Sequence, residues 1–242
     1  MKNSKLLVLT VITTTAINMF NLHQYEVYAA SNITPYMTIT SNHNFESEIT
    51  SFSDLGILSK ALNIFLTENP QSTEQEQDLF LIKYVESGNF ANEKNKRGLG
   101  DYIPGYGSLN SVERDLALKH PSQAITVYNC ANDAVSATLE YYGESGYQNN
   151  SDAFRHCCWN ALMKKEMGAT NANTWATAHE SDSSGIDKEM DLYNNYMGRI
   201  IDVSGKSNSQ IYELVKKKVK NGYCKRIINN KLTATNGSGL IK

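Results

Sequence analysis

The chain has 242 residues and a formal net charge of −2 with neutral histidines. This balance excludes the overall basic field typical of nucleic-acid-binding proteins, so we expect no nucleic-acid partner from charge alone. The length is sufficient for one domain with a substantial core.

Residues 1–30 predict a cleavable export signal. Lys2 and Lys5 precede an apolar run, and the stretch ends on Ala29 and Ala30, small residues after which signal peptidase would cut. The alternative is an uncleaved membrane anchor. A spanning helix needs roughly 20 predominantly apolar residues, whereas threonine and asparagine interrupt this run. We therefore expect a secreted, extracellular protein without a membrane span after cleavage.

The next segment, 31–97, is interpreted as a flexible leader followed by a helical N-terminal extension. Its first twenty residues are rich in Ser, Thr and Asn. Apolar residues from Phe52 to Phe90 then recur at helical spacing and predict two short helices separated by a turn at Asn69-Pro70. A charged hinge is expected from Asn92 to Arg97. The extension is equally compatible with a pro-segment or with a cover over part of the core.

A glycine-rich segment from Gly98 to Gly107 marks the start of the main domain, 98–242. Asn110 and Glu113 resemble a capping box and predict a short helix that ends at His120, before Pro121. Pro121 suits the first position of a longer helix that stops at Gly143.

Ser151 is the predicted N-cap of the next helix, which runs from Asp152 to Met167 and is closed by Gly168. Further helices are expected at about 173–180, 186–203 and 209–221. Arg226-Ile227-Ile228 is a weak strand signal. The predicted fold is all-α, a single bundle of about five to six helices with a short helical N-terminal extension.

Four cysteines lie in the exported part: Cys130, Cys157, Cys158 and Cys224. An oxidising compartment permits disulfides. Cys157 and Cys158 point roughly 100° apart on a helix of 3.6 residues per turn, so we expect one of them to pair with Cys130 and the other with Cys224. The sequence does not choose between the pairings. A cysteine metal site is disfavoured because no C-x-x-C pair is present.

Polar residues that are costly to bury concentrate on three predicted helices between residues 152 and 199. Asp152 and His156 are four residues apart and share a helix face, and Gly198 permits a neighbouring helix to approach closely. Helices of a bundle place such sets opposite one another in the core. The candidate catalytic residues are Asp152, Arg155, His156, His179, Glu180, Asp191, Asn194, Asn195 and Arg199.

His156, His179 and Asp191 are the candidate metal ligands, with Glu180 as a further ligand or acid/base group. Mixed nitrogen and oxygen donors suit zinc or manganese. A bound metal would create a nucleophile from water, and Arg155 or Arg199 would bind a phosphate or carboxylate of the substrate. The set is not a zincin helix because His179-Glu180 lacks the second histidine of H-E-x-x-H.

Two alternatives avoid a metal. In the first, His156 or His179 acts as a general base oriented by Asp152 or Glu180. In the second, the residues have no chemistry: Asp152 stabilises a helix N-terminus, and His156 with Asp191 forms a buried hydrogen-bonded pair that fixes helix packing.

Three blocks of sequence follow one another in a recognisable order: Asp152-Ala153-Phe154-Arg155-His156-x-x-Trp159-Asn160-Ala161-Leu162-Met163, Ala178-His179-Glu180, and Met190-Asp191-Leu192-Tyr193-Asn194-Asn195-x-x-Gly198-Arg199. Together they resemble a bacterial helical domain of unknown function, found in secreted proteins and at the C-terminal ends of some polymorphic-toxin-like proteins. The resemblance covers roughly residues 98–203. It implies an exported helical domain with these polar residues as its signature, and it implies no activity.

Two functions therefore compete. The first is a secreted, metal-assisted hydrolase that cleaves a phosphoester or amide bond. The second is a non-catalytic helical module that binds a cell-surface or protein partner, for which the lysine-rich helix near Lys216 is the candidate contact.

Overall fold

The structure is a computed structural model that describes residues 43–96 and 106–242. The predicted export signal and most of the glycine-rich boundary lie outside these residues. The helices are α1 (His43–Glu48), α2 (Phe52–Glu68), α3 (Glu74–Glu86), α4 (Asn89–Lys96), α5 (Ser111–Lys119), α6 (Pro121–Tyr142), α7 (Asn150–His179), α8 (Gly185–Arg199) and α9 (Asn208–Lys220). One hairpin, β1 (Lys225–Ile228) and β2 (Lys231–Ala234), follows α9. The predominantly helical fold is confirmed.

The N-terminal helices agree with the sequence except at two places. Residues 43–48, predicted as part of the flexible leader, form α1, because Phe45 is buried in the core. The turn between α2 and α3 lies at Asn69-Pro70 as predicted. The charged hinge at 92–97 was wrong, because residues 89–96 form α4. Gly88 ends α3 with a positive φ of 76°, and Phe90 is fully buried and anchors the new helix to the core. A single apolar anchor in eight residues gives no periodic pattern, which is why the sequence did not show this helix.

The helices α5 and α6 begin and end where their capping residues predict. The backbone N–H of Glu113 donates to the Asn110 side chain over 2.9 Å, and Asn110 N–H donates back to the Glu113 carboxylate. Pro121 opens α6, where a missing N–H costs nothing. Gly143 closes α6 in the left-handed conformation, at φ 70°.

The start of α7 corrects the sequence interpretation. Its N-cap is Asn149 and not Ser151, because the Asn149 side chain accepts hydrogen bonds from the N–H groups of Ser151 and Asp152. Gly168 leaves helical geometry as expected (φ 81°, ψ 163°), but the helix resumes at once and runs to His179. Gly168 therefore separates two helical segments of α7, 150–167 and 169–179, and the predicted helix end at Gly168 is confirmed. The next helix, α8, ends at Arg199, four residues earlier than predicted.

The hairpin was almost entirely missed by the sequence analysis. Its strands are antiparallel, with Ile228 opposite Lys231. Asn229 and Asn230 connect them with φ angles of 50° and 57°. Asparagine tolerates the left-handed region, and two such residues in succession match the twist of a tight hairpin. The Asn-Asn pair was the available signal.

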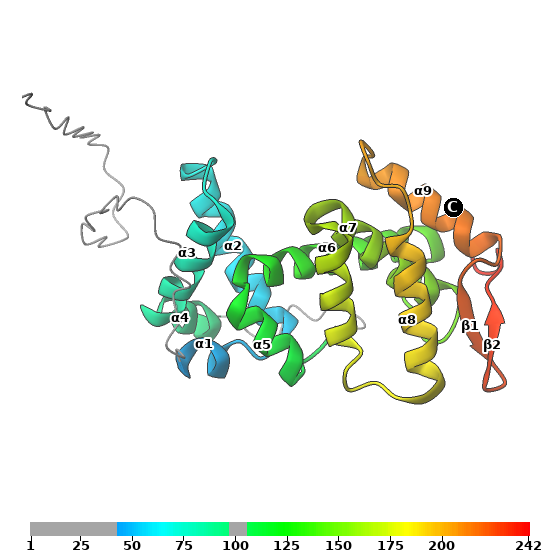
Figure 1. The fold of residues 1–242 in the computed structure, drawn as a ribbon, viewed down its shortest axis with the longest axis horizontal. Helices are drawn as coiled ribbons and strands as arrows, with labels where there is room; N and C mark the ends of the chain where they lie inside the picture. The colour runs from blue at the N-terminus through cyan, green and yellow to red at the C-terminus, as the bar shows by residue number, and fades with distance from the viewer. Residues whose placement is uncertain (1–42, 97–105) are drawn as a thin grey trace, which may run out of the picture. The chain divides into compact units, whose positions relative to one another are not determined.

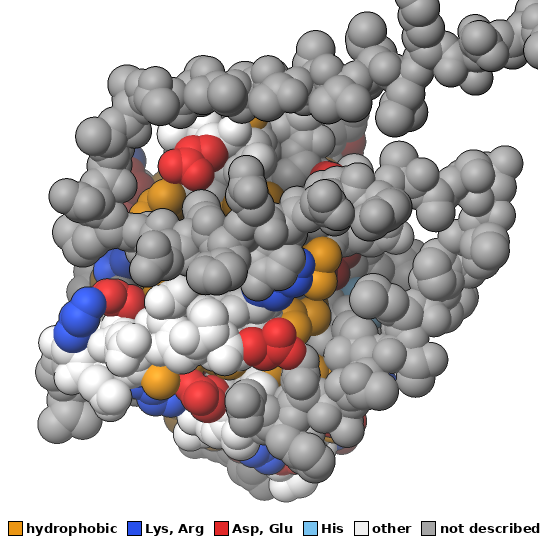
Figure 2. Space-filling model, turned by 90° about the vertical axis from the view of Figure 1, so that its left-hand side faces the viewer, with side chains coloured by type: hydrophobic (Ala, Val, Ile, Leu, Met, Phe, Trp, Pro, Cys, Tyr) orange, Lys and Arg blue, Asp and Glu red, His pale blue; other side chains and the backbone are white. Residues whose placement is uncertain are grey.

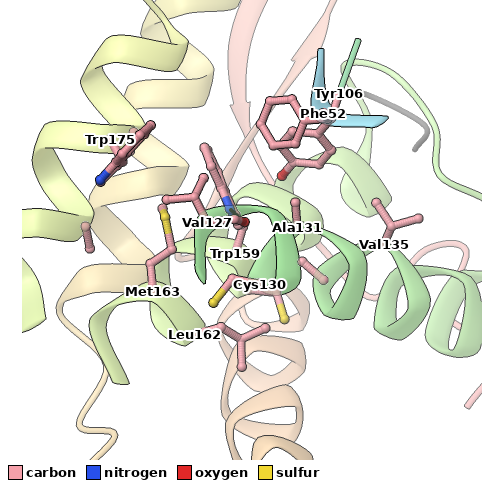
Figure 3. Close-up of a cluster of buried hydrophobic side chains, with 14 of the residues drawn as sticks. Phe52, Tyr106, Val127, Cys130, Ala131, Val135, Trp159, Leu162, Met163 and Trp175 are labelled. Carbon is pink, nitrogen blue, oxygen red and sulfur yellow. Dashed lines mark hydrogen bonds between the residues drawn. The ribbon is translucent and has the colours of Figure 1, made fainter. Parts of the chain in front are cut away.

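The core is continuous across the described residues. Trp159 of α7 is fully buried, and its indole N–H donates to the carbonyl oxygen of Val127 on α6 over 3.2 Å. Figure 3 shows Trp159 in the middle of a cluster, with Phe52 and Tyr106 on one side and Met163 and Trp175 on the other. Because Phe52 begins α2, the N-terminal helices share one hydrophobic core with the rest.

The disulfide prediction is corrected by the structure, in which all four cysteines are buried and free. The cysteines nevertheless lie near the partners that were expected, because Cys157 and Cys158 point about 100° apart on their helix. The thiol of Cys157 hydrogen-bonds to that of Cys224, and Cys158 lies near Cys130 on α6. The helix geometry thus predicted which cysteines face each other but not their covalent state.

The surface carries both signs of charge. Figure 2 shows acidic and basic side chains interspersed on the coloured part of one face. Within the described residues, no helix has the length and apolar character needed to cross a membrane.

Candidate functional site

Three of the predicted polar residues converge in the core between α7 and α8. Nε2 of His156 lies 3.5 Å from Oδ1 of Asp152, its neighbour one turn earlier on α7, and 3.4 Å from Oδ1 of Asp191 on α8. One ligand atom from each residue lies within 4.8 Å of the others. We call Asp152, His156 and Asp191 the His156 cluster.

The approach of α8 to α7 depends on Gly198. A Cβ atom at this position would lie 2.1 Å from the backbone oxygen of Cys157, so only glycine permits this spacing. The sequence prediction of a close helix approach at Gly198 is confirmed. Figure 1 shows α8 between the last part of α7 and the hairpin, both of which it contacts.

Arg155 and Gln148 hold the carboxylate of Asp152 from two directions. Arg155 forms a buried ion pair with Oδ1, and the Gln148 backbone N–H donates to Oδ2 over 2.6 Å. Burial alone raises the pKa of Asp152, but the hydrogen bond and charge of His156, the charge of Arg155 and the Gln148 N–H lower it to about 2. Asp152 is therefore ionised at neutral pH.

The pKa of Asp191 is shifted in the opposite direction, upwards. Burial raises its pKa to about 6, and the charges of Glu180 and Asp152 add to this, although His156 and Arg155 oppose it. For His156, burial lowers the pKa, but the two aspartates outweigh burial and the net pKa is raised. Such a coupled group of one imidazole and two carboxylates favours an extra positive charge, either a proton or a metal ion.

Two atoms of the His156 cluster lack a hydrogen bond. Within the described structure, Nδ1 of His156 and Oδ1 of Asp191 are buried without a partner in hydrogen-bond geometry. Buried polar atoms in native proteins nearly always have partners. Oδ1 of Asp191, beside Nε2 of His156, therefore indicates a position where a cation or water completes the contacts, whereas Nδ1 faces Glu180 on the opposite side of the ring.

Glu180 lies on the other side of His156. Its Oε1 is 3.9 Å from Nδ1 of His156, and its Oε2 accepts a hydrogen bond from Ser183 Oγ over 2.9 Å. A carboxylate behind a ligating histidine fixes the tautomer of the ring and raises its basicity. Glu180 thus faces Nδ1 of His156, the ring nitrogen opposite to the one near Asp152 and Asp191, without hydrogen-bonding to it.

An amide network extends from Glu180 along the α7–α8 contact. Asn195 Nδ2 lies 3.5 Å from Glu180 Oε1, and Asn160 Nδ2 donates to Asn195 Oδ1 over 2.7 Å. Arg199 Nη1 donates to Asn160 Oδ1 over 2.6 Å. Asn195 and Arg199 were candidates from the sequence, whereas Asn160 was missed. Its position four residues after His156 was the available signal.

Two candidates, His179 and Asn194, belong neither to the His156 cluster nor to the contacts described around it. His179 Nδ1 is 2.7 Å from the carboxylate of Glu113 on α5, and its ring contacts that of Trp159 at a centroid distance of 5.1 Å. Asn194 exchanges two hydrogen bonds with the backbone of Lys225 and so attaches the hairpin to α8. Glu113 was missed as a partner because it comes 66 residues before His179.

A second group of possible ligands has a structural explanation. Glu74, Asp78 and His120 lie close together near the start of α6. Asp78 accepts the backbone N–H of Ser122 over 2.8 Å, and Glu74 accepts the side chain of Gln123 over 2.8 Å. Asp78 thus caps α6 and Glu74 binds a side chain of its first turn, and the His156 cluster is the better metal candidate.

Comparison with known proteins finds one matching family model, and the function of that family is unknown. Residues 114–223 match the model of a domain of unknown function (DUF6973). The matched stretch contains the whole His156 cluster and overlaps the region expected from the sequence resemblance. No curated protein matches the chain, and no solved structure does.

Proposed function

We propose that this chain is a secreted, metal-dependent hydrolase that binds zinc or manganese at Asp152, His156 and Asp191 and cleaves a phosphoester or amide bond. The observation that carries the proposal is the His156 cluster itself: two buried donor groups and one half-buried donor group from two helices, with Oδ1 of Asp191 unpartnered beside Nε2 of His156. The export signal predicted in residues 1–30 is part of the proposal.

The donor set fits zinc or manganese in number and type. One imidazole nitrogen and two carboxylate oxygens leave coordination positions open, as catalytic sites require. When bound, such an ion lowers the pKa of water and polarises a substrate oxygen. Glu180 then orients His156, and Asn195 with Asn160 holds Glu180 in place.

Elemental analysis of the purified protein after reconstitution with zinc or manganese tests the site. We expect about one ion per chain in the wild type and loss of the ion in His156→Ala and Asp191→Ala, because each variant removes one of three donors. His179→Ala is the matched control, since His179 binds Glu113 instead, and it should keep its ion. Metal retained in both cluster variants, or absent from the wild type, would refute the proposal.

A second candidate function rests on the charge of the C-terminal segment. Residues 204–242 contain nine lysine or arginine residues and one glutamate. Lys206, Lys216, Lys217 and Lys220 line a shallow groove along α9. Such a basic stripe suits an anionic phospholipid surface, which corresponds to a non-catalytic module that binds a cell surface.

Vesicle sedimentation tests this second function. A binding module should sediment with vesicles of phosphatidylcholine and phosphatidylserine at low salt but not with phosphatidylcholine alone, because the attraction is electrostatic. Lys217→Glu combined with Lys220→Glu should abolish sedimentation, whereas Lys60→Glu, an exposed lysine of α2, should not. Equal binding to both kinds of vesicle would exclude this function.

A further inference from the structure

The guanidinium of Arg155 is only partly used by the contacts within the structure. Arg155 is 6% exposed, and its Nη2 pairs with Asp152. Its Nε and Nη1 are buried and have no hydrogen-bond partner. A buried arginine normally satisfies its donors with carboxylates, carbonyl oxygens or a bound anion. Two unused nitrogens therefore indicate a position for acceptor oxygens.

A second unused donor lies beside it. Tyr106 is 2% exposed, and its hydroxyl has no hydrogen-bond partner. Cζ of Arg155 lies 5.4 Å from the centre of the Tyr106 ring, and the hydroxyl is near the guanidinium without reaching hydrogen-bond geometry. Burial raises the pKa of Tyr106, so its hydroxyl is neutral and available as a donor.

Asp152 links these donors to the His156 cluster. Its Oδ1 is the atom that Arg155 contacts and also the atom nearest to His156. Through Asp152, the guanidinium that carries the unused Nε and Nη1 is thus joined to the proposed metal position, and Tyr106 packs against that guanidinium. We propose that Arg155 and Tyr106 bind a phosphoryl group of the substrate next to the metal, so that the substrate is a phosphoester and not an amide.

This inference rests on the proposed function and narrows it. A phosphoryl group has several acceptor oxygens, so one can face the metal while others accept from the guanidinium and the hydroxyl. An amide carbonyl offers a single oxygen and would leave the remaining donors unpaired. The charges around the site favour a phosphodiester over a phosphomonoester. Arg155, Asp152, Asp191 and Glu180 together carry a net charge that one divalent ion neutralises. A phosphodiester, with one negative charge, then adds less charge to the core than a doubly charged phosphomonoester.

The test is a titration of zinc-loaded protein with dimethyl phosphate, followed by ³¹P NMR, with metal content measured on the same samples. We expect saturable binding in the wild type. Tyr106→Phe, which removes only the hydroxyl, should weaken binding at least about threefold, and Arg155→Lys more, with zinc content unchanged. Acetamide, the amide probe, should not compete with dimethyl phosphate.

The matched control is Tyr142→Phe. Tyr142 is also buried with an unpartnered hydroxyl, but it packs against Phe154, so dimethyl phosphate binding should not change. If the Tyr106 hydroxyl serves a ligand, Tyr106→Phe should leave the melting temperature of the metal-free protein unchanged or higher while binding falls.

Two results would overturn the inference. The first is zinc-loaded protein that does not bind dimethyl phosphate, which leaves the metal proposal intact. The second is unchanged binding in both Tyr106→Phe and Arg155→Lys. Absence of zinc from the wild type is the separate result that would refute the proposed function.

Discussion

The environment of each ionisable side chain decides its role in this protein. His156 and His179 both lie on α7, yet His156 meets two aspartates and His179 meets Glu113. The contact between Asp152 and His156 could be predicted from the sequence because both belong to one helix turn. The contact between His179 and Glu113 could not be predicted, because it depends on how α5 packs against α7. Sequence spacing thus predicted half of the site, and tertiary packing supplied the other half.

Asp54 provides a prediction about pH and stability. It accepts hydrogen bonds from Thr50 N–H (2.9 Å) and Ser51 N–H (3.0 Å) and pairs with Lys94 of α4 at 2.9 Å. Burial raises its pKa, but these partners outweigh burial, and the pKa is lowered from 3.8. A lowered folded-state pKa gives stability that is present above about pH 4 and is lost as the pH falls further.

We therefore expect Asp54→Asn to reduce the free energy of unfolding by about 1–3 kcal/mol at pH 7. The difference from wild type should shrink as the pH falls from 4 to 3, as measured by urea unfolding. Asp115→Asn, at an exposed position of α5, is the control and should stay within about 0.5 kcal/mol of wild type. A difference that does not depend on pH would contradict this account.

At the scale of elements, capping residues predicted helix ends better than periodicity did. Asn110 and Gly143 marked the limits of α5 and α6 correctly. The helix α4 and the hairpin were missed because each is held by contacts that are distant in sequence. Phe90 buries itself in the core, and Asn194 of α8 holds the backbone of Lys225. Short elements of this kind have no stable pattern of their own.

Gly198→Ala tests the contact between α7 and α8. The new methyl group would meet the Cys157 backbone oxygen at 2.1 Å and Cβ of Asn160 at 2.9 Å. Because a backbone oxygen cannot rotate away, α8 must shift, at a cost of about 2–3 kcal/mol. Urea unfolding should show this loss. Gly107→Ala, with no atom within 4 Å of the added Cβ, should be neutral, and a stable Gly198→Ala protein would mean that the helices are less tightly packed.

At the scale of the whole molecule, the reactivity of the four buried thiols measures whether the core is folded. Burial raises the pKa of Cys130 and Cys158, and for Cys157 the thiol of Cys224 and burial together raise it. Thiol reagents attack the thiolate, so both effects protect the folded protein. We expect protein purified without reductant to react slowly with Ellman's reagent when folded and to show four thiols in denaturant. Two thiols or none after unfolding would instead establish disulfides.

The order of the site residues along the chain has a consequence for folding. The His156 cluster, Glu180 and the Asn160 network all come from α7, α8 and the turn between them, a stretch of about fifty consecutive residues. Closing such short loops costs little entropy, and local contacts form faster than distant ones. The site therefore belongs to the part of the chain that can form first, whereas Tyr106 and the N-terminal helices join it through contacts of longer range.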